Sequence, residues 1–264
     1  MIKVYLYRKR KRLKRLAWRY FKNFFLFFSI NVEKLRMGTG GFDYDIQRLM
    51  PKVKDHPLVL FDIGANRGQT AIAYASLYKE ALIYSFEPDP DTFLELKENV
   101  MGIGDRVKLF NLALGDNESQ QFLNRTASSD GSSLLPVSDV AKERPAEQWT
   151  SQTDRILVNV TVLNNFCLAN NVSQIDLLKI DTQGYELNIL KGADKMLAAG
   201  QVKFILVEAL FQDFYQSQAD FQALYAFIRS HGFELVDIYN RGYLKDKHRI
   251  AWADLLFIHQ SVVS

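Results

Sequence analysis

The stretch Leu58 to Gly68 reads LVLFDIGANRG and joins a short apolar run to a glycine loop. Apart from Asp62, its first six residues are large and apolar, and Pro57 and Gly64 bound the run, so it predicts a fully buried strand rather than half a helix. Such a strand usually belongs to a parallel sheet that is covered on both faces. Because Gly64 and Gly68 lack side chains, backbone N–H groups of the loop would approach a ligand closely. The stretch therefore predicts the floor of a nucleotide-type cofactor site.

A second motif lies at the end of the next predicted strand, ALIYSFE, over residues 81–87. Its last residue, Glu87, follows Gly64 by 23 residues. An acidic residue about 20 residues after the glycine turn is where a Rossmann-like unit hydrogen-bonds ribose hydroxyls. A glycine turn alone can simply make a tight corner, so the two motifs together favour a nucleoside site more strongly than either does alone.

Strand and helix patterns alternate along most of the chain. We predict strands over residues 58–63, 81–87, 106–111, 156–162, 175–181, 202–208, 233–239 and 252–259, and helices over residues 69–78, 90–100, 163–170, 184–199 and 220–231. Asp89 and Pro90 are the expected N-cap and first residue of the second helix. This rhythm, with loops of a few residues, is typical of βαβ units and predicts a parallel sheet with right-handed crossovers.

The last two predicted strands break the rhythm. About a dozen residues without a helix pattern separate them, so we predict that they are antiparallel neighbours. A dinucleotide-binding Rossmann sheet is all parallel. The ending of the chain therefore argues against a dinucleotide cofactor.

The chain divides into segments of different composition. We assign residues 1–37 to a basic amphipathic arm, residues 38–57 to a connector with a short helix, and residues 58–260 to one α/β domain. Within that domain, residues 116–155 are polar, with only a hint of strand over residues 121–123. A connection this long is usually a functional lid or a poorly ordered insertion. Because it follows the third strand, we expect it to lie over the mouth of the cofactor pocket.

Basic residues are concentrated in the arm. Of 33 Lys and Arg, ten lie within residues 1–22, which contain no acidic residue. The rest of the chain contains the other 23 together with all 30 acidic residues. Apolar residues from Leu13 to Phe28 recur on one face of a predicted helix. The longest uninterrupted apolar run, residues 24–28, is far shorter than the ~20 residues that a bilayer core requires.

A basic amphipathic helix with an aromatic face is typical of segments that lie in the headgroup region of an anionic membrane. We therefore expect a cytoplasmic protein that can dock peripherally on the inner face of a membrane through residues 1–30. The same face could instead pack on the protein's own body or on a second subunit, so the oligomeric state stays open. Nucleic acid is disfavoured as a partner, because the acidic body offers no continuing basic groove.

Composition limits the remaining function classes. A chain of 264 residues, 48% of them hydrophobic, has enough material for the core of one domain with additions. The only cysteine, Cys167, excludes an intrachain disulfide and fits a reducing compartment, and no zinc-binding pattern is present.

Six motifs in this order resemble the FkbM family of S-adenosylmethionine (SAM) dependent methyltransferases. They are FDIGANRGQT (Phe61 to Thr70), YSFEPDP (Tyr84 to Pro90), NLALGD (Asn111 to Asp116), IDLLKIDTQGYELNILKGA (Ile175 to Ala193), ILVE (Ile205 to Glu208) and DLLFI (Asp254 to Ile258). The resemblance spans roughly residues 58–258 and leaves out the arm and most of residues 134–155. It implies a Rossmann-like class I methyltransferase fold: a mostly parallel seven-stranded sheet with a terminal antiparallel strand and helices on both faces.

The resemblance also implies SAM as the methyl donor and a hydroxyl acceptor on a sugar, a glycolipid or another secondary metabolite. It places Gly64, Ala65, Asn66 and Gly68 at the methionine end of SAM, Asp62 behind that loop or near the methionine amine, Glu87 at the ribose hydroxyls, and Asn111 to Ala113 beside the adenine. Arg67 departs from the small or aliphatic residue expected at its position and would change the local electrostatics.

A hydroxyl acceptor needs a base, and acidic residues end two predicted strands. Asp181 is the first candidate, since the carboxyl ends of strands face the crevice in open α/β sheets, and Glu208 is the second. Tyr185 and Glu186 are candidate acceptor contacts. We expect Lys179, which lies in an apolar strand, to pair with a neighbouring acid.

Other roles stay open for these residues. Asp181 could cap the following helix, and Glu186 could only complement the helix dipole. Asp181 with Glu208 could also hold a divalent cation, although we assign no metal. The competing functions are an NAD-dependent oxidoreductase and a non-catalytic, membrane-associated binding protein that kept the fold.

Overall fold

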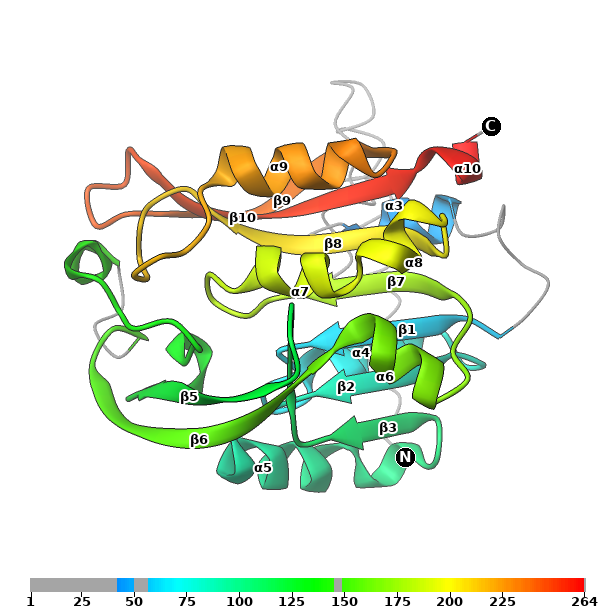
Figure 1. The fold of residues 1–264 in the computed structure, drawn as a ribbon, viewed down its shortest axis with the longest axis horizontal. Coiled ribbons are helices and arrows are strands. Elements are labelled where there is room, and N and C mark those ends of the chain that lie inside the picture. Colours follow the sequence, from blue (N-terminus) through cyan, green and yellow to red (C-terminus); the bar gives the residue numbers. More distant parts are fainter. Residues whose placement is uncertain (1–41, 50–56, 145–148, 264) are drawn as a thin grey trace, which may run out of the picture. The chain divides into compact units, whose positions relative to one another are not determined.

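The computed structural model describes residues 42–49, 57–144 and 149–263 (Figure 1). The predicted arm, residues 1–37, lies outside these ranges. In the described part of the chain, no helix has both the length and the apolar character needed to cross a bilayer.

The connector contributes one short helix, α3 (Phe42–Leu49), to a unit that comprises residues 1–51. Within α3, Arg48 lies 3.4 Å from Asp45, one helical turn apart. The rest of the chain, residues 52–264, forms the second unit, which carries the predicted α/β domain.

The main sheet of this domain has seven strands in the order β3-β2-β1-β7-β8-β10-β9 (Figure 1). The strands are β1 (Val59–Ile63), β2 (Leu82–Phe86), β3 (Val107–Phe110), β7 (Ile175–Ile180), β8 (Val202–Leu210), β9 (Phe233–Tyr243) and β10 (Ile250–His259). The four pairings from β3 to β8 are parallel, whereas β10 runs antiparallel to both β8 and β9. This arrangement confirms the predicted class I methyltransferase sheet with its antiparallel ending.

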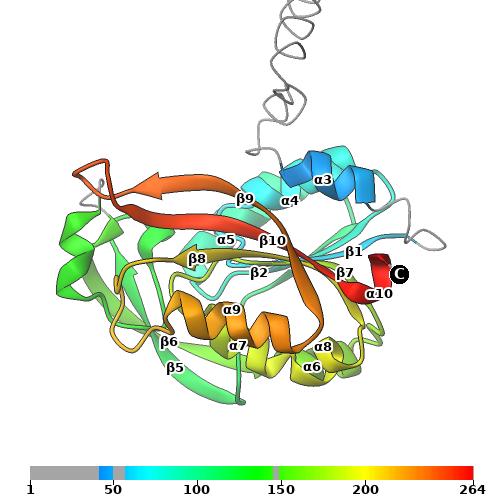
Figure 2. The same ribbon diagram turned by 90° about the horizontal axis from the view of Figure 1, so that it is seen from above.

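Helices cover both faces of the sheet, with α4 on one side and α6, α7, α8 and α9 on the other (Figure 2). They are α4 (Gln69–Leu77), α5 (Pro90–Val100), α6 (Leu163–Ala169), α7 (Glu186–Gly192), α8 (Asp194–Ala198) and α9 (Phe221–Ser230), followed by the terminal turn α10 (Gln260–Val263). The helix predicted over residues 184–199 is therefore two helices. At Gly192 the backbone lies so close to Gly115 that a Cβ on Gly192 would be 2.0 Å from the carbonyl oxygen of Gly115.

The core lies between the central strands and these helices. Phe61 of β1 stacks on Tyr84 of β2 with ring centroids 4.8 Å apart, and the ring of Phe166 meets Phe86 edge-on at the same distance. All four side chains are buried. Because β1 and β7 are covered on both faces, their sequences are almost uniformly apolar, and the few charged residues in them stand out.

A second, three-stranded sheet has the order β4-β6-β5, with β4 (Ala113–Gly115), β5 (Ser119–Thr126) and β6 (Gln152–Val162). The strand hinted at over residues 121–123 is the longer β5, so much of the segment over residues 116–155 is regular structure, and its role as a lid stays a prediction. Two short 3-10 helices, η3 (Ser129–Gly131) and η4 (Asp139–Glu143), connect β5 to β6. The strand β5 was difficult to predict because it contains polar residues. Gln121 faces inward and is half-buried, and its side-chain amide hydrogen-bonds the Tyr185 hydroxyl at 3.1 Å.

Candidate active site

The loop after β1 brings the first two predicted elements of the site together. Gly64 adopts φ +79°, and a Cβ on it would lie 1.9 Å from the backbone oxygen of Asp181. Its N–H and that of Ala65 donate to the Phe86 carbonyl at 3.1 and 2.9 Å. The expectation that the glycines free these N–H groups for a ligand is therefore wrong. The glycine is required because the loop crosses directly over the end of β7.

Gly68 is also required for steric reasons. It adopts φ +89° at the start of α4, and a Cβ would lie 2.7 Å from the Leu96 side chain of α5. The neighbouring Arg67 reaches Glu95 of α5 at 2.6 Å, on the exposed surface. The unexpected arginine thus joins α5 to the loop.

Glu87 lies where the sequence predicts a ribose-binding carboxylate. Its two oxygens accept the N–H groups of Asn66 and Asp89, each at 2.9 Å, so it ties the glycine loop to the start of α5. Burial raises the pKa of Glu87 to about 7. Each oxygen keeps a second lone pair beyond the backbone bond that it accepts. These lone pairs fit the hydroxyl donors of a ribose, so the residues present are compatible with SAM.

The predicted adenine-side residues have different roles. Asn111 donates its side-chain amide to the carbonyls of Glu87 and Pro88, at 2.9 and 3.0 Å, and so holds the end of β2. Ala113 is buried in β4, where it packs with Leu123 and other apolar residues of the small sheet. Of these two residues, Asn111 contacts Glu87.

A buried lysine organises the carboxylates at the ends of β1 and β7. Lys179 lies 3.3 Å from Asp62 and 3.5 Å from Asp181, which confirms the predicted ion pair. Burial alone would lower the pKa of Lys179, but the carboxylates of Asp62, Asp181 and Asp254 raise it above its usual value. Since the Asp62 side chain has no exposed surface, we infer that it holds Lys179 rather than reaching a cofactor amine.

The two predicted bases lie next to one another. The side-chain amide of Gln183 donates to Asp181 at 3.0 Å and to Glu208 at 2.7 Å. Burial, together with the charges of Asp181 and Asp254, raises the pKa of Glu208 well above its usual value. Burial also raises the pKa of Asp254 to about 6. Asp181, with 36% of its side chain exposed, is the more accessible carboxylate of the two.

Glu186 and Tyr185 have partners within the protein. One oxygen of Glu186 accepts the N–H groups of Thr182 and Gly184, at 2.9 and 3.1 Å, and burial raises the pKa of this carboxyl to about 7. The buried Tyr185 hydroxyl pairs with Gln121 of β5. We infer that Glu186 holds the turn between β7 and α7 and that Tyr185 joins α7 to the small sheet. These roles differ from the predicted acceptor contacts. The helix-capping alternative for Asp181 is not met, because α7 begins after Tyr185 without a side-chain cap.

The segment between β5 and β6 contacts both halves of the site. The Asn66 side chain donates to Asp130 at 2.6 Å and accepts from the Ser129 hydroxyl at 2.9 Å. A few residues further on, the Ser133 hydroxyl donates to the Gln183 carbonyl at 2.7 Å. This turn therefore spans from the glycine loop to the loop after β7 that carries Asp181 and Gln183.

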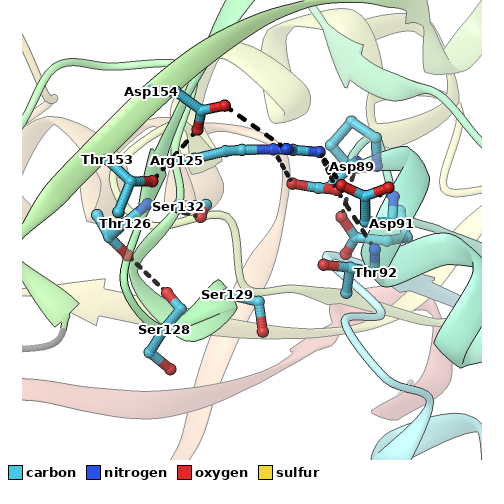
Figure 3. A network of polar contacts seen from close by, with 12 residues as sticks. Asp89, Asp91, Thr92, Arg125, Thr126, Ser128, Ser129, Ser132, Thr153 and Asp154 are labelled. Carbon is cyan, nitrogen blue, oxygen red and sulfur yellow. Dashed lines mark hydrogen bonds and ion pairs between the residues drawn. The ribbon is translucent and has the colours of Figure 1, made fainter.

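Arg125, near the end of β5, binds two carboxylates at the start of α5 (Figure 3). Its guanidinium makes two bonds to Asp89, at 2.6 and 2.7 Å, and a third to Asp91 at 2.9 Å. Asp89 is the predicted N-cap of α5, confirmed by its bonds to the N–H groups of Asp91 and Thr92. The N-cap of the helix that follows Glu87 is thus also the anchor of β5.

Sequence reasoning missed two residues at the centre of this network. Gln183 lies inside the KIDTQGYE motif, so its position was a signal. Arg144, which donates to Gln183 at 3.1 Å, lies in the polar segment and had no signal in the sequence. Among the described residues, no cluster of three or more His, Cys, Asp or Glu side chains is arranged to hold a metal ion.

Comparison with known proteins gives a consistent result. A family model described as the methyltransferase FkbM domain matches residues 62–235. The 2-O-methyltransferase NoeI of Sinorhizobium fredii is 29% identical over 218 residues, which cover 80% of this chain and 86% of that protein. Methyltransferase 1 of Beauveria bassiana is 25% identical, over 66% of this chain and 71% of that protein. The hexuronic acid methyltransferase AglP of Haloferax volcanii is 27% identical, over 63% and 62%.

Proposed function

Because this chain belongs to the FkbM family of SAM-dependent methyltransferases, we propose that it methylates a hydroxyl group of a sugar or of a sugar-containing lipid or metabolite. The names of two relatives, a 2-O-methyltransferase and a hexuronic acid methyltransferase, support an oxygen on a sugar-like acceptor. The observation that carries the proposal is the partly exposed carboxylate of Asp181, held at the end of β7 directly beneath the glycine loop.

Bound SAM supplies a methyl group on a positively charged sulfur, which is already a good leaving group. The protein must align an acceptor oxygen and exclude water. A sugar hydroxyl is a poor nucleophile near neutral pH, and a positioned base that takes its proton contributes about 10²- to 10⁴-fold. We assign this role to Asp181. Glu208 is the second candidate, because it lies within strand β8, whereas Asp181 lies just past the end of β7 with 36% of its side chain exposed.

For the cofactor, we propose that Glu87 receives the ribose hydroxyls and that Asn66 and the loop from Gly64 to Gly68 border the methionine end. Two observations support this placement: Glu87 and the loop are joined through the N–H of Asn66, and Asn111 is fixed to the carbonyl of Glu87. The acidic surroundings also match the positive charge on the sulfur of SAM.

The substitution Glu87→Gln should weaken SAM binding about 10- to 100-fold, which corresponds to the loss of hydrogen bonds to a charged group. The new amide would also turn a donor toward one of two backbone N–H groups. Calorimetric titration with SAM measures the effect. Glu98→Gln, an exposed carboxylate on the next helix, is the matched control and should bind SAM normally. Equal affinities for the two variants would remove Glu87 from the site.

Transfer of radiolabel from methyl-labelled SAM into lipid and polysaccharide extracts tests the function directly. We expect label in a base-stable ether on a sugar, identified by hydrolysis and mass spectrometry. Binding of NAD without binding of SAM in calorimetry would instead favour an oxidoreductase. Binding of SAM without transfer to any extract would favour a non-catalytic protein.

We also propose that residues 1–30 dock on an anionic membrane surface, which would place the enzyme near a lipid-linked acceptor. The support is compositional: ten cations and no acid within residues 1–22. Each cation near such a surface contributes about 1 kcal/mol, and salt screens the attraction. The full chain should therefore float with phosphatidylserine liposomes at low salt, less so at high salt, and not with neutral liposomes. A chain beginning at Gly38 is the control, and equal flotation of the two would contradict docking by the arm.

A further inference from the structure

We propose that Gln183 is a positioning residue. Its side-chain amide links the buried Arg144 to the carboxylates of Asp181 and Glu208 and holds these carboxylates in place. The inference deepens the proposed function and rests on it, because it assigns the groups that hold the proposed base. Its support is a continuous chain of hydrogen bonds from the segment between β5 and β6 to the ends of β7 and β8.

The orientation of the Gln183 amide follows from its partners. Nη1 of Arg144 lies 3.1 Å from Oε1 of Gln183, and a guanidinium can only donate hydrogen bonds. The oxygen of the amide must therefore face Arg144, and the NH₂ group must face the other way. There its two hydrogens meet Asp181 at 3.0 Å and Glu208 at 2.7 Å. Every polar atom of this amide has a partner, and reversing it would oppose donors to donors.

The backbone of Gln183 is also held by the protein. It adopts φ +57°, a left-handed conformation that non-glycine residues rarely use, so surrounding contacts must impose it. The Ser133 hydroxyl donates to its carbonyl at 2.7 Å, and Glu186 accepts the N–H of the next residue, Gly184. A strained residue fixed from both sides at a proposed active site is consistent with a positioning role.

Arg144 is an anchored cation. The side chain is buried, and the guanidinium carbon lies 5.2, 4.8 and 5.3 Å from the ring centres of Trp149, Phe214 and Trp252. The Tyr215 hydroxyl accepts from Arg144 at 3.1 Å and donates to the Gly131 carbonyl at 2.9 Å. An arginine stays protonated in proteins, so this end of the chain of bonds does not change with pH.

Charge explains why the carboxylates need such a residue. The groups that face the pair are Lys179 of β7, Asp62 of β1, Asp254 of β10, Glu186 of α7, and Arg144 and Tyr215 beyond Gln183. Two neighbouring carboxylates repel one another when both are ionised, and a shared N–H donor stabilises the ionised form. The Gln183 amide therefore holds the two carboxylates in place, with one N–H directed at each.

The decisive variant is Gln183→Glu, which keeps the shape and the acceptor for Arg144 but turns an oxygen toward Asp181 and Glu208. With SAM saturating, kcat should fall by about a hundredfold, the loss that misplacing a group by about 1 Å can cause, while KM changes little. The added negative charge raises the pKa of the base, so the acid limb of the pH–rate profile should move to higher pH. Gln120→Glu makes the same change on an exposed position of β5 and should leave both quantities unchanged.

Arg144→Met tests the other end and does not add a charge beside the carboxylates. It removes both the cation that faces Glu208 and the guanidinium that fixes the Gln183 oxygen, so it should lower kcat as Gln183→Glu does. Titration of ¹³C-labelled carboxyl groups by NMR, in protein without SAM or acceptor, should show the Glu208 midpoint at higher pH in both variants. If Gln183→Glu does not fold, Arg144→Met decides.

A wild-type Glu208 midpoint and an undiminished kcat in the folded variants would overturn the proposal, even if KM changed. If the wild-type protein methylates no hydroxyl, the proposed function fails. In that case the NMR midpoints still decide whether Gln183 controls the carboxylates.

Discussion

Replacing Asp181 by Asn should lower kcat by about 10²- to 10⁴-fold, the range that a positioned base contributes. Asn has nearly the same shape, so the contacts with Gln183 and Lys179 change little in volume, but the side chain can no longer accept a proton. SAM affinity should stay close to that of the wild type, because the proposed ribose contact, Glu87, is on another strand. Steady-state kinetics at saturating SAM and calorimetry measure the two effects separately.

The control is Asp105→Asn, which makes the same exchange in an exposed loop before β3, an edge strand of the sheet. It should leave kcat unchanged. Undiminished turnover by Asp181→Asn would discard Asp181 as the base and would direct attention to Glu208. Loss of SAM binding together with turnover would instead make Asp181 part of the cofactor site.

Replacing Gly64 by Ala should both destabilise the fold and abolish SAM binding. The left-handed conformation at φ +79° costs a non-glycine residue about 1–2 kcal/mol. In addition, the Cβ would lie 1.9 Å from the backbone oxygen of Asp181, and overpacking of this kind costs about 1–3 kcal/mol. We expect the free energy of unfolding, measured in urea, to fall by the sum, and the displaced loop to lose its bond to Glu87.

Two other glycines separate these contributions. Gly104 has φ +82° and ψ −166°, a conformation that essentially only glycine adopts, but nothing lies within 4 Å of a Cβ, so Gly104→Ala should show a conformational cost alone, about 1–3 kcal/mol. Gly102 has neither feature, and Gly102→Ala should change the stability by less than about 0.5 kcal/mol. If Gly64→Ala costs no more than Gly104→Ala, the close approach to Asp181 is not what requires a glycine.

The sequence by itself determined the architecture, because that information is local. The apolar run before Gly64, the cap at Asp89 with Pro90, and the missing helix between the last two strands each predict one element or one connection, and the structure confirms them. Lys179 was also predictable, since a cation in an apolar strand needs a carboxylate partner. Glu87 was found because the spacing between a glycine turn and the next strand is set by one βαβ unit.

Only the tertiary structure decided how the site is held. The small sheet was missed because Gln121 of β5 is satisfied by Tyr185, 64 residues away, so no alternating apolar pattern marks the strand. The same holds for Arg144 and Gln183, which are 39 residues apart and meet through polar atoms. Hydrophobic periodicity reports which face of an element is buried, whereas hydrogen bonds between polar side chains depend on which distant segments the fold brings within about 3 Å. The position of the proposed base is therefore a property of the folded chain.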